Sequence, residues 1–162
     1  MLITDSPAAS AVAELRWSWA QESDDVIGPW RGEPSFTAAV RSWTDDPQRT
    51  VWVAHTPDQA VGMVCLTEYT RMPSPRTSAA GSWGYLGHLY VRPEYRGAGI
   101  GAQLVDCVLR NAEHRGYRKV ILSPTELSIP LYSRHGFTRD NDVMIRRFDR
   151  RGRFAGSSIH GR

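Results

Sequence analysis

Hydrophobic residues recur at helical spacing in two segments near the start of the chain. Leu15 and Trp19 are four residues apart in segment 8–23, and apolar residues repeat at similar spacing in segment 35–45. A period near 3.6 residues places such side chains on one face of a helix. The intervening segment 24–34 contains two glycines and two prolines, which favour a loop. The pattern therefore predicts two amphipathic helices joined by a loop.

The middle of the chain predicts three strands. Segments 51–55 and 61–69 are rich in apolar residues and are separated by the turn 56–59, as in a β-hairpin. Segment 71–82, with its prolines and serines, predicts a mobile loop. Segment 83–91 is apolar on both faces, as a central strand should be. Simple alternation along this strand assigns Trp83, Tyr85, Leu89 and Val91 to one face, and Leu86, His88 and Tyr90 to the other.

The strongest helix prediction falls in the last third of the chain. Residues 99–114 carry apolar side chains every four positions, and Gly116 ends the helix. We also expect a short buried strand at 120–122, a short helix at 128–135, and final strands at 137–139 and 143–148. These elements predict an α+β fold, in which a mixed but largely antiparallel sheet has helices on both faces. We expect one domain over residues 1–148 and a flexible basic tail over 149–162.

The composition is that of an ordinary globular domain. The chain has 162 residues, of which 41% are hydrophobic and 23% charged, with a net charge of +3. No apolar run approaches the roughly 20 residues that span a bilayer, and the N-terminus lacks the features of a signal peptide. Cys65 and Cys107 fall within predicted regular elements, which favours free buried thiols over a disulfide. These features favour a cytoplasmic protein without a membrane partner.

The densest chemical signal is a glycine-rich loop before the long helix. Glycines at positions 97, 99 and 101 free the backbone N–H groups from neighbouring side chains where a helix begins. The helix N-terminus adds partial positive charge, so the loop suits a diphosphate. The glycine spacing differs from that of dinucleotide-binding folds, and no Lys-Ser/Thr pair of a nucleoside-triphosphate loop follows. A purely structural turn is the remaining alternative, and Arg96 either adds charge to the loop or pins it.

Two segments of the sequence resemble the GNAT superfamily of N-acetyltransferases. The first is Leu-Tyr-Val-Arg-Pro-Glu-Tyr-Arg-Gly at 89–97, continuing into the family's Arg-x-x-Gly-x-Gly pattern at Arg96, Gly99 and Gly101. The second is Pro-Leu-Tyr-Ser-Arg-His-Gly-Phe at 130–137. The resemblance covers residues from about 50 to 148. It implies acetyl-coenzyme A as cosubstrate and a sheet splayed at the cofactor slot. Only residues 2–4 are available for the family's first strand, which is therefore short or missing.

The resemblance also implies roles for individual residues. A backbone N–H near Tyr90 would stabilise the developing oxyanion, and the Tyr132 phenol would be the general acid for the leaving thiolate. The alternative role for Tyr132 is packing in the core. The residues expected to bind the cofactor, mainly through backbone groups, are Leu89, Tyr90, Val91, Arg96, Gly97, Ala98, Gly99, Ile100, Gly101, Ala102 and Thr125.

The general base stays open between two candidates. Glu68 lies near the end of the second hairpin strand, and His88 lies within the central strand, where an imidazole would titrate in the useful range. Glu126 is expected at a helix start capped by Thr125. The strand at 120–122 carries no glutamate, which argues against a base from that strand.

The acceptor pocket is expected between the first two helices, their connecting loop and segment 73–82. This region is rich in tryptophans and acids, which would suit a cationic amine; they are Trp17, Trp19, Trp30, Trp43, Glu14, Glu22, Asp24, Asp25 and Glu33. We therefore expect acetyl transfer to a primary amine of a small molecule, such as an amino acid, a polyamine or an aminoglycoside-like antibiotic.

Other functions stay open beside this one. A protein or peptide could be the acceptor, or the domain could be a catalytically silent acyl-coenzyme A sensor. Nucleic-acid binding through the arginine-rich tail is a weaker alternative. The histidines are scattered without the spacing of a zinc site, so no metal is expected. An exposed C-terminal strand would allow two subunits to pair.

Overall fold

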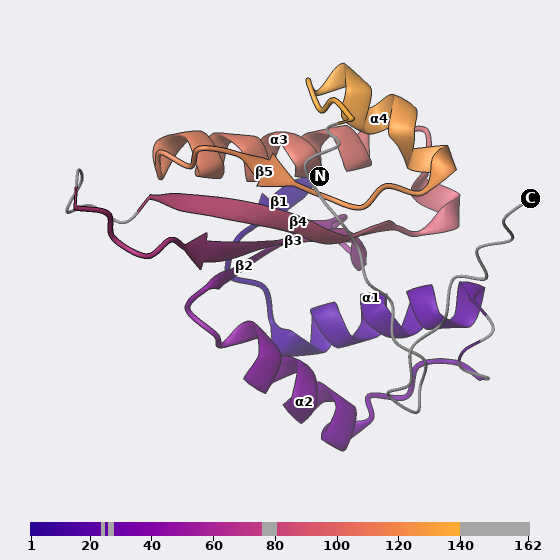
Figure 1. Cartoon of the computed structure of the whole chain (residues 1–162). Helices are drawn as coiled ribbons and strands as arrows, with labels where there is room; N and C mark the ends of the chain where they lie inside the picture. The colour runs from indigo at the N-terminus through magenta and orange to yellow at the C-terminus, as the bar shows by residue number, and fades with distance from the viewer. Residues whose placement is uncertain (24, 26–27, 76–80, 140–162) are drawn as a thin grey trace, which may run out of the picture.

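A five-stranded sheet lies between two layers of helices in the computed structural model, which describes residues 1–23, 25, 28–75 and 81–139 (Figure 1). The strands, in sheet order, are β1 Leu2–Thr4, β2 Arg49–His55, β3 Ala60–Thr70, β4 Ser82–Val91 and β5 Val120–Ile121. The helices are α1 Ala9–Glu22, α2 Pro34–Thr44, α3 Ile100–His114 and α4 Ile129–Arg134, with 3₁₀ turns η1 Pro93–Tyr95 and η2 Glu126–Ser128.

The sheet is mixed but mostly antiparallel. Strands β1 to β4 pair antiparallel in sequence order, and β5 pairs parallel to β4. A parallel neighbour needs a crossover connection, which α3 supplies. Helices α1 and α2 cover one face of the sheet, and α3 and α4 cover the other (Figure 1). The predicted fold class is confirmed.

Each face of the sheet has its own hydrophobic core. Leu104, Val105 and Val108 of α3 are fully buried against one face. Leu15 of α1 is fully buried against the other, where Val53 of β2 also lies. The spacing of apolar residues along α1 and α3 therefore predicted correctly which face of each helix is buried, although Trp19 of α1 is only half-buried.

Most predicted elements are confirmed to within two residues at each end, and β1 is the short first strand. The strand predicted at 137–139 is wrong, because these residues are irregular. A strand requires a hydrogen-bonded neighbour, and no strand in the described ranges pairs with this segment. Phe137 instead packs edge-on against Tyr132, with ring centroids 5.7 Å apart. The strand predicted at 143–148 and the tail at 149–162 lie outside the described residues.

A β-bulge in β4 overturns the predicted alternation of its side chains. Met63 pairs with Tyr90 and Cys65 with Gly87, so two residues of β4 lie opposite one residue of β3. One of the two is His88, whose φ of 55° lies in the left-handed region. The extra residue puts Leu86 on the same face as Leu89 and Val91, which were predicted on the opposite face.

Strands β4 and β5 part soon after they meet. Only Gly84 and Tyr85 of β4 pair with β5, through Val120 and Ile121. Beyond Tyr85 no described strand pairs with this edge of β4, so its backbone groups are open to a ligand. Both residues of β5 are half-buried, so this strand is less buried than predicted. The splayed slot implied by the sequence resemblance is present, and the bulge lies on its β4 side.

Candidate active site

The glycine loop between β4 and α3 presents an uninterrupted series of free backbone donors. Gly97 and Gly99 have φ values of 81° and 78°, which favour glycine. The first backbone bond of α3 runs from Gln103 N–H to the Gly99 carbonyl. Within the described ranges, the N–H groups from Gly97 to Ala102 therefore have no hydrogen-bond partner. Six such donors at a helix N-terminus form an anion cradle.

Two arginines hold this loop against α1. Arg92, with only 14% of its side chain exposed, donates to the Ala60 carbonyl at 2.8 Å and pairs with Glu14 at 2.6 Å. Arg96 donates from Nε to the Val91 carbonyl at 2.9 Å and pairs with Glu22 at 2.7 Å. Of the two roles open to Arg96, the observed contacts are those of a pin.

The end of β4 lies between these two arginine–glutamate pairs and the slot where β4 and β5 part. The Tyr90 hydroxyl donates to Glu22 at 2.6 Å, and its ring stacks on Trp19. Leu89 and Val91 face the opposite core. Their backbone edge faces the parting of β4 and β5, as cofactor binding along that strand would require. Thr125 lies on the far side, where its N–H donates to Ser128 Oγ at 2.9 Å and begins η2 as expected.

Tyr132 projects from α4 into the core on the α3 face of the sheet. The side chain is 8% exposed, and its hydroxyl has no hydrogen-bond partner in the part of the chain that the structure describes. Burial raises the pKa of Tyr132 above 10, and the nearby Tyr85 phenol raises it further. The phenol is therefore protonated and able to donate at neutral pH.

Glu68, one of the two candidate bases, is held in a polar cluster. Its carboxylate accepts from the Tyr117 hydroxyl at 2.6 Å and from Arg115 at 2.5 Å. The hydrogen bond from Tyr117 contributes most to lowering the pKa of Glu68, with smaller contributions from Ser82 and Arg115. A carboxylate with a lowered pKa and two committed donors is a poor proton acceptor.

His88, the other candidate, lies on the α1–α2 face of the sheet beside two indoles. Its ring centroid is 6.3 Å from Trp19 and 5.2 Å from Trp43, edge-on in both cases. Partial burial lowers the pKa of His88 below 6.5, and the charges of Arg16 and Arg49 lower it further. The imidazole is therefore neutral at physiological pH and can accept a proton.

A hollow of about 260 Å³ lies behind His88, between the two N-terminal helices and the sheet. Its walls are mostly apolar and come from α1, α2, β2 and β3. Of the segments predicted to form the acceptor pocket, the two helices line this hollow, whereas no described residue of their connecting loop or of segment 73–82 contributes to it. Arg16, which was not among the predicted residues, also lines the hollow. Val12, Arg16 and Trp19 follow one another at helical spacing, and that signal could have identified Arg16.

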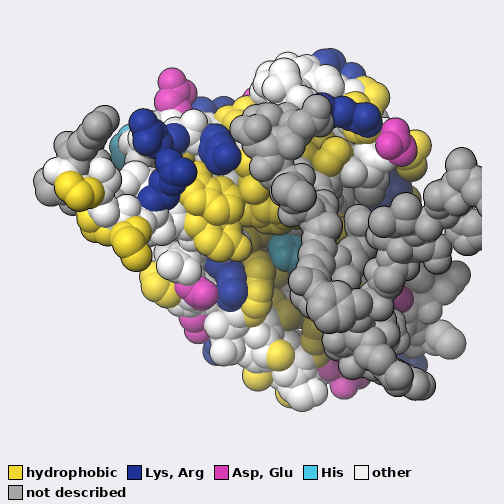
Figure 2. Space-filling model, viewed as in Figure 1, with side chains coloured by type: hydrophobic (Ala, Val, Ile, Leu, Met, Phe, Trp, Pro, Cys, Tyr) yellow, Lys and Arg dark blue, Asp and Glu magenta, His cyan; other side chains and the backbone are white. Residues whose placement is uncertain are grey.

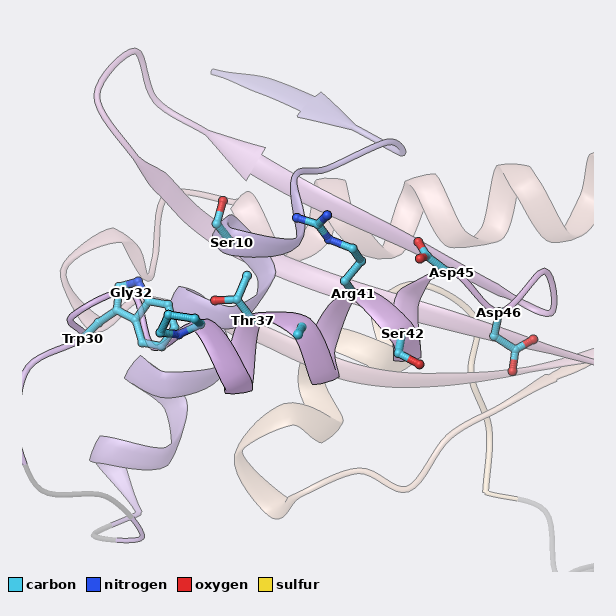
Figure 3. Close-up of a pocket in the computed structure, with 10 residues that line it drawn as sticks. Ser10, Trp30, Gly32, Thr37, Arg41, Ser42, Asp45 and Asp46 are labelled. Carbon is cyan, nitrogen blue, oxygen red and sulfur yellow. The ribbon is translucent and has the colours of Figure 1, made fainter.

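A second hollow runs along the outer side of α2 and measures about 820 Å³ (Figure 3). Figure 3 shows Thr37, Arg41 and Ser42 spread along the helix, with Trp30 at one end and Asp46 at the other. These side chains do not converge on a point, as groups that bind one small ligand would. The smaller hollow behind His88 is therefore the better candidate for an acceptor.

The acids predicted to surround the acceptor differ in their contacts: Asp25 and Glu33 make no ion pair within the described ranges, whereas Glu14 and Glu22 do. Glu14 and Glu22 pair with the two clamping arginines. Trp17, Trp30 and Phe36 pack on one another and connect α1 to α2. Asp24 lies outside the described residues. On the face of the molecule shown in Figure 2, basic side chains lie beside an exposed hydrophobic area. The expectation of an acidic rim is wrong for Glu14 and Glu22.

Other chemistry has little support in the described ranges. No helix there is long and apolar enough to cross a membrane. No three potential metal-ligating side chains cluster in the same part of the chain. Cys65 and Cys107 are both free, as predicted, although only Cys65 is fully buried.

Comparison with known proteins gives consistent matches. The model of the acetyltransferase (GNAT) family matches residues 10–137. N-acetyltransferase 8B of Rattus norvegicus is 33% identical over 120 residues, which cover 68% of this chain and 52% of that protein. Glucosamine 6-phosphate N-acetyltransferase of Trypanosoma brucei brucei is 39% identical over 54 residues, covering 33% of this chain and 37% of that protein. The matches thus span about half or less of these relatives.

Solved structures share the fold at low sequence identity. A predicted acetyltransferase with acetyl-CoA from Clostridium acetobutylicum superposes with a TM-score of 0.67 at 19% identity. The match covers 89% of this chain and 94% of that one. The likeness extends over nearly the whole of both chains, and at this identity it concerns the fold.

Proposed function

This chain belongs to the acetyltransferase (GNAT) family, and from that premise we propose that it transfers an acetyl group from acetyl-coenzyme A to a primary amine of a small molecule. The observation that carries the proposal is the series of six N–H groups from Gly97 to Ala102 that have no partner among the described residues, beside a strand edge that no described strand covers where β4 and β5 part. The donors suit the diphosphate, and the open edge suits the amides of the pantetheine arm.

Several groups of this chain would take part in the reaction. Acetyl-coenzyme A supplies the activated acyl group: a C–N bond forms, the C–S bond breaks, the amine loses a proton and the thiolate gains one. His88, neutral at physiological pH, takes the amine proton directly or through water. Tyr132 donates its proton to the thiolate. A backbone N–H near Tyr90 stabilises negative charge on the acyl oxygen.

The observed contacts favour His88 over Glu68 as the base. The Glu68 carboxylate already accepts from Tyr117 and Arg115, whereas the His88 imidazole makes no hydrogen bond within the described ranges. His88 also borders the hollow where an acceptor would bind. In this mechanism Glu68 connects β3 to the end of α3 and does not touch the substrate.

The loop is tested by removing one donor from it. Gly101→Pro deletes an N–H in the first turn of α3, where proline is tolerated. Gly101→Ala is the matched control, because an added Cβ would lie 3.5 Å from Leu131, an ordinary contact. A hydrogen bond to a charged group contributes about 1.5–3 kcal/mol, so we expect coenzyme A to bind the Pro variant roughly tenfold more weakly than the Ala variant.

Calorimetry gives the affinities, and thiol release with a panel of amines gives the activity. Equal affinities of the two variants would remove the loop from cofactor binding. Wild-type protein that binds acetyl-coenzyme A but acetylates none of the amines or peptides would be the silent sensor.

A further inference from the structure

The hollow behind His88 has the size and lining of a site for one apolar side chain. Its volume is about 260 Å³, and one water occupies about 30 Å³ in the liquid, so roughly nine non-hydrogen atoms fit. Its apolar walls are formed by Val12, Phe36, Ala39, Val40, Trp43, Val51, Met63 and Val64. A space with these walls favours an aromatic or branched aliphatic group over a sugar or a polyamine.

The lining of the hollow includes a positively charged side chain. Arg16 lines it and lies over the Trp19 ring, with its guanidinium carbon 4.9 Å from the ring centroid. No described carboxylate pairs with Arg16. Arg49, in contrast, donates to the Trp43 carbonyl at 2.7 Å and pairs with Asp46. Among the described residues Arg16 thus lines this site without an ion-pair partner, and a guanidinium suits a carboxylate.

Resting on the proposed function, we propose that the acceptor is an α-amino acid with a large apolar side chain. The side chain fills the hollow, the carboxylate pairs with Arg16, and the amino group lies near His88. The charge of Arg16 and the pairing of Glu14 and Glu22 with arginines both disfavour a polycationic acceptor. Of the acceptors expected from the sequence, the structure therefore favours the amino acid.

The acceptor preference is tested first with wild-type protein at saturating acetyl-coenzyme A. L-Phenylalanine is compared with phenethylamine, which lacks the carboxylate, and with L-alanine, which lacks the ring. Spermidine and glucosamine 6-phosphate complete the panel. We expect kcat/KM for L-phenylalanine to exceed that of every other acceptor by roughly tenfold or more.

Two pairs of variants locate the preference. Arg16→Gln should reduce kcat/KM for L-phenylalanine about tenfold more than for phenethylamine, and Arg16→Lys should recover part of the loss. Arg41→Gln, an exposed guanidinium at the other hollow, is the control. Ala39→Phe adds a ring at an exposed position that lines the hollow, so it should abolish the preference for phenylalanine over alanine. Ala38→Phe, on the outer side of the same helix, should not.

A binding measurement separates this inference from the proposed function. Trp19 and Trp43 flank the site, so L-phenylalanine should change tryptophan fluorescence in the presence of coenzyme A, and less so in Arg16→Gln. Efficient acetylation of spermidine or phenethylamine, or an equal effect of Arg16→Gln on both phenylalanine and phenethylamine, would overturn the inference and leave the acetyltransferase intact. Absence of coenzyme A binding and of any thiol release would overturn the proposed function, and the inference with it.

Discussion

At the scale of single residues, His88 combines an unfavourable backbone with a useful environment. Its φ of 55° is in a region that costs non-glycine residues about 1–3 kcal/mol, and such conformations gather at functional sites. The bulge places the imidazole against Trp19 and Trp43, whose edges hold it over the hollow. Partial burial lowers the pKa of His88, and the charges of Arg16 and Arg49 lower it further, so the imidazole is neutral. The strained backbone of His88 thus accompanies the ring position that we propose for the general base.

Replacing this residue by Asn removes the proposed base while keeping a side chain that tolerates left-handed backbone. We expect His88→Asn to lower kcat about 10²-fold, the usual size of general-base effects. In wild type, log kcat/KM should rise with pH at slope two below the pKa of His88, which is lowered from 6.5. Between that pKa and the pKa of the acceptor amine, the slope should be one. The slope of two reports deprotonation of both His88 and the acceptor amine.

The variant should show slope one throughout, because only the amine then titrates. The measurement is a pH series of initial rates of thiol release. A slope of two that persists in the variant would assign the second titration to another group.

At the scale of elements, β3 and the end of α3 are joined by polar contacts in addition to packing. The backbone after α3 turns at Gly116, and the Tyr117 N–H bonds to the Ala112 carbonyl at 2.8 Å, which closes the helix. Tyr117 and Arg115 then reach Glu68 on β3. This cluster lies where β4 and β5 still pair, so it holds the closed end of the slot.

The cluster makes a pH-dependent contribution to stability. The folded pKa of Glu68 is lowered from 4.5, so the contribution is present above pH 4.5 and is lost as the pH falls through the folded value. Because the pair is partly exposed, we expect Glu68→Gln to lower the free energy of unfolding by less than about 1 kcal/mol at pH 7. The difference from wild type should shrink in acid.

Urea unfolding at pH 7 and at acid pH measures this difference. Glu113→Gln, at an exposed position in α3 without an ion pair in the described ranges, is the control. If the stability difference between wild type and Glu68→Gln grew in acid, the stabilising contribution would not come from ionised Glu68.

At the scale of the whole molecule, the sheet separates two halves of the proposed chemistry. His88 and the apolar hollow lie on the α1–α2 face, and Tyr132 lies in the core on the α3–α4 face (Figure 1). The opening between β4 and β5 is where the two faces communicate. An amine can therefore approach from one side of the sheet while the leaving sulfur is protonated from the other.

Tyr132→Phe tests the second half of this arrangement. The ring keeps its packing against Phe137, and the lost hydroxyl has no partner in the described part of the chain, so stability should change little. We expect kcat to fall roughly 10²-fold, with the coenzyme A dissociation constant unchanged. Stopped assays and calorimetry give the two quantities. Unchanged kcat would leave Tyr132 as a core residue only.

Much of this fold could be predicted from local pattern. Helical spacing identified α1, α2 and α3, because burial of one helix face requires that period. The glycines before α3 indicated a loop with left-handed residues, because few other residues adopt that backbone. The resemblance in segments 89–97 and 130–137 indicated the family, which the match over residues 10–137 shows.

Tertiary structure decided what depends on partners distant in sequence. The extra residue at His88 is defined only by the register of β4 against β3, so alternation within β4 could not predict which side chains share a face. Whether an acid is free or paired depends on arginines about 70 residues away, as for Glu14 and Glu22. By itself the sequence determined most of the elements and the glycine loop before α3, because these follow from neighbours along the chain. The positive charge at the proposed acceptor site, and the faces on which the proposed acid and base lie, arise only when the sheet brings separate segments together.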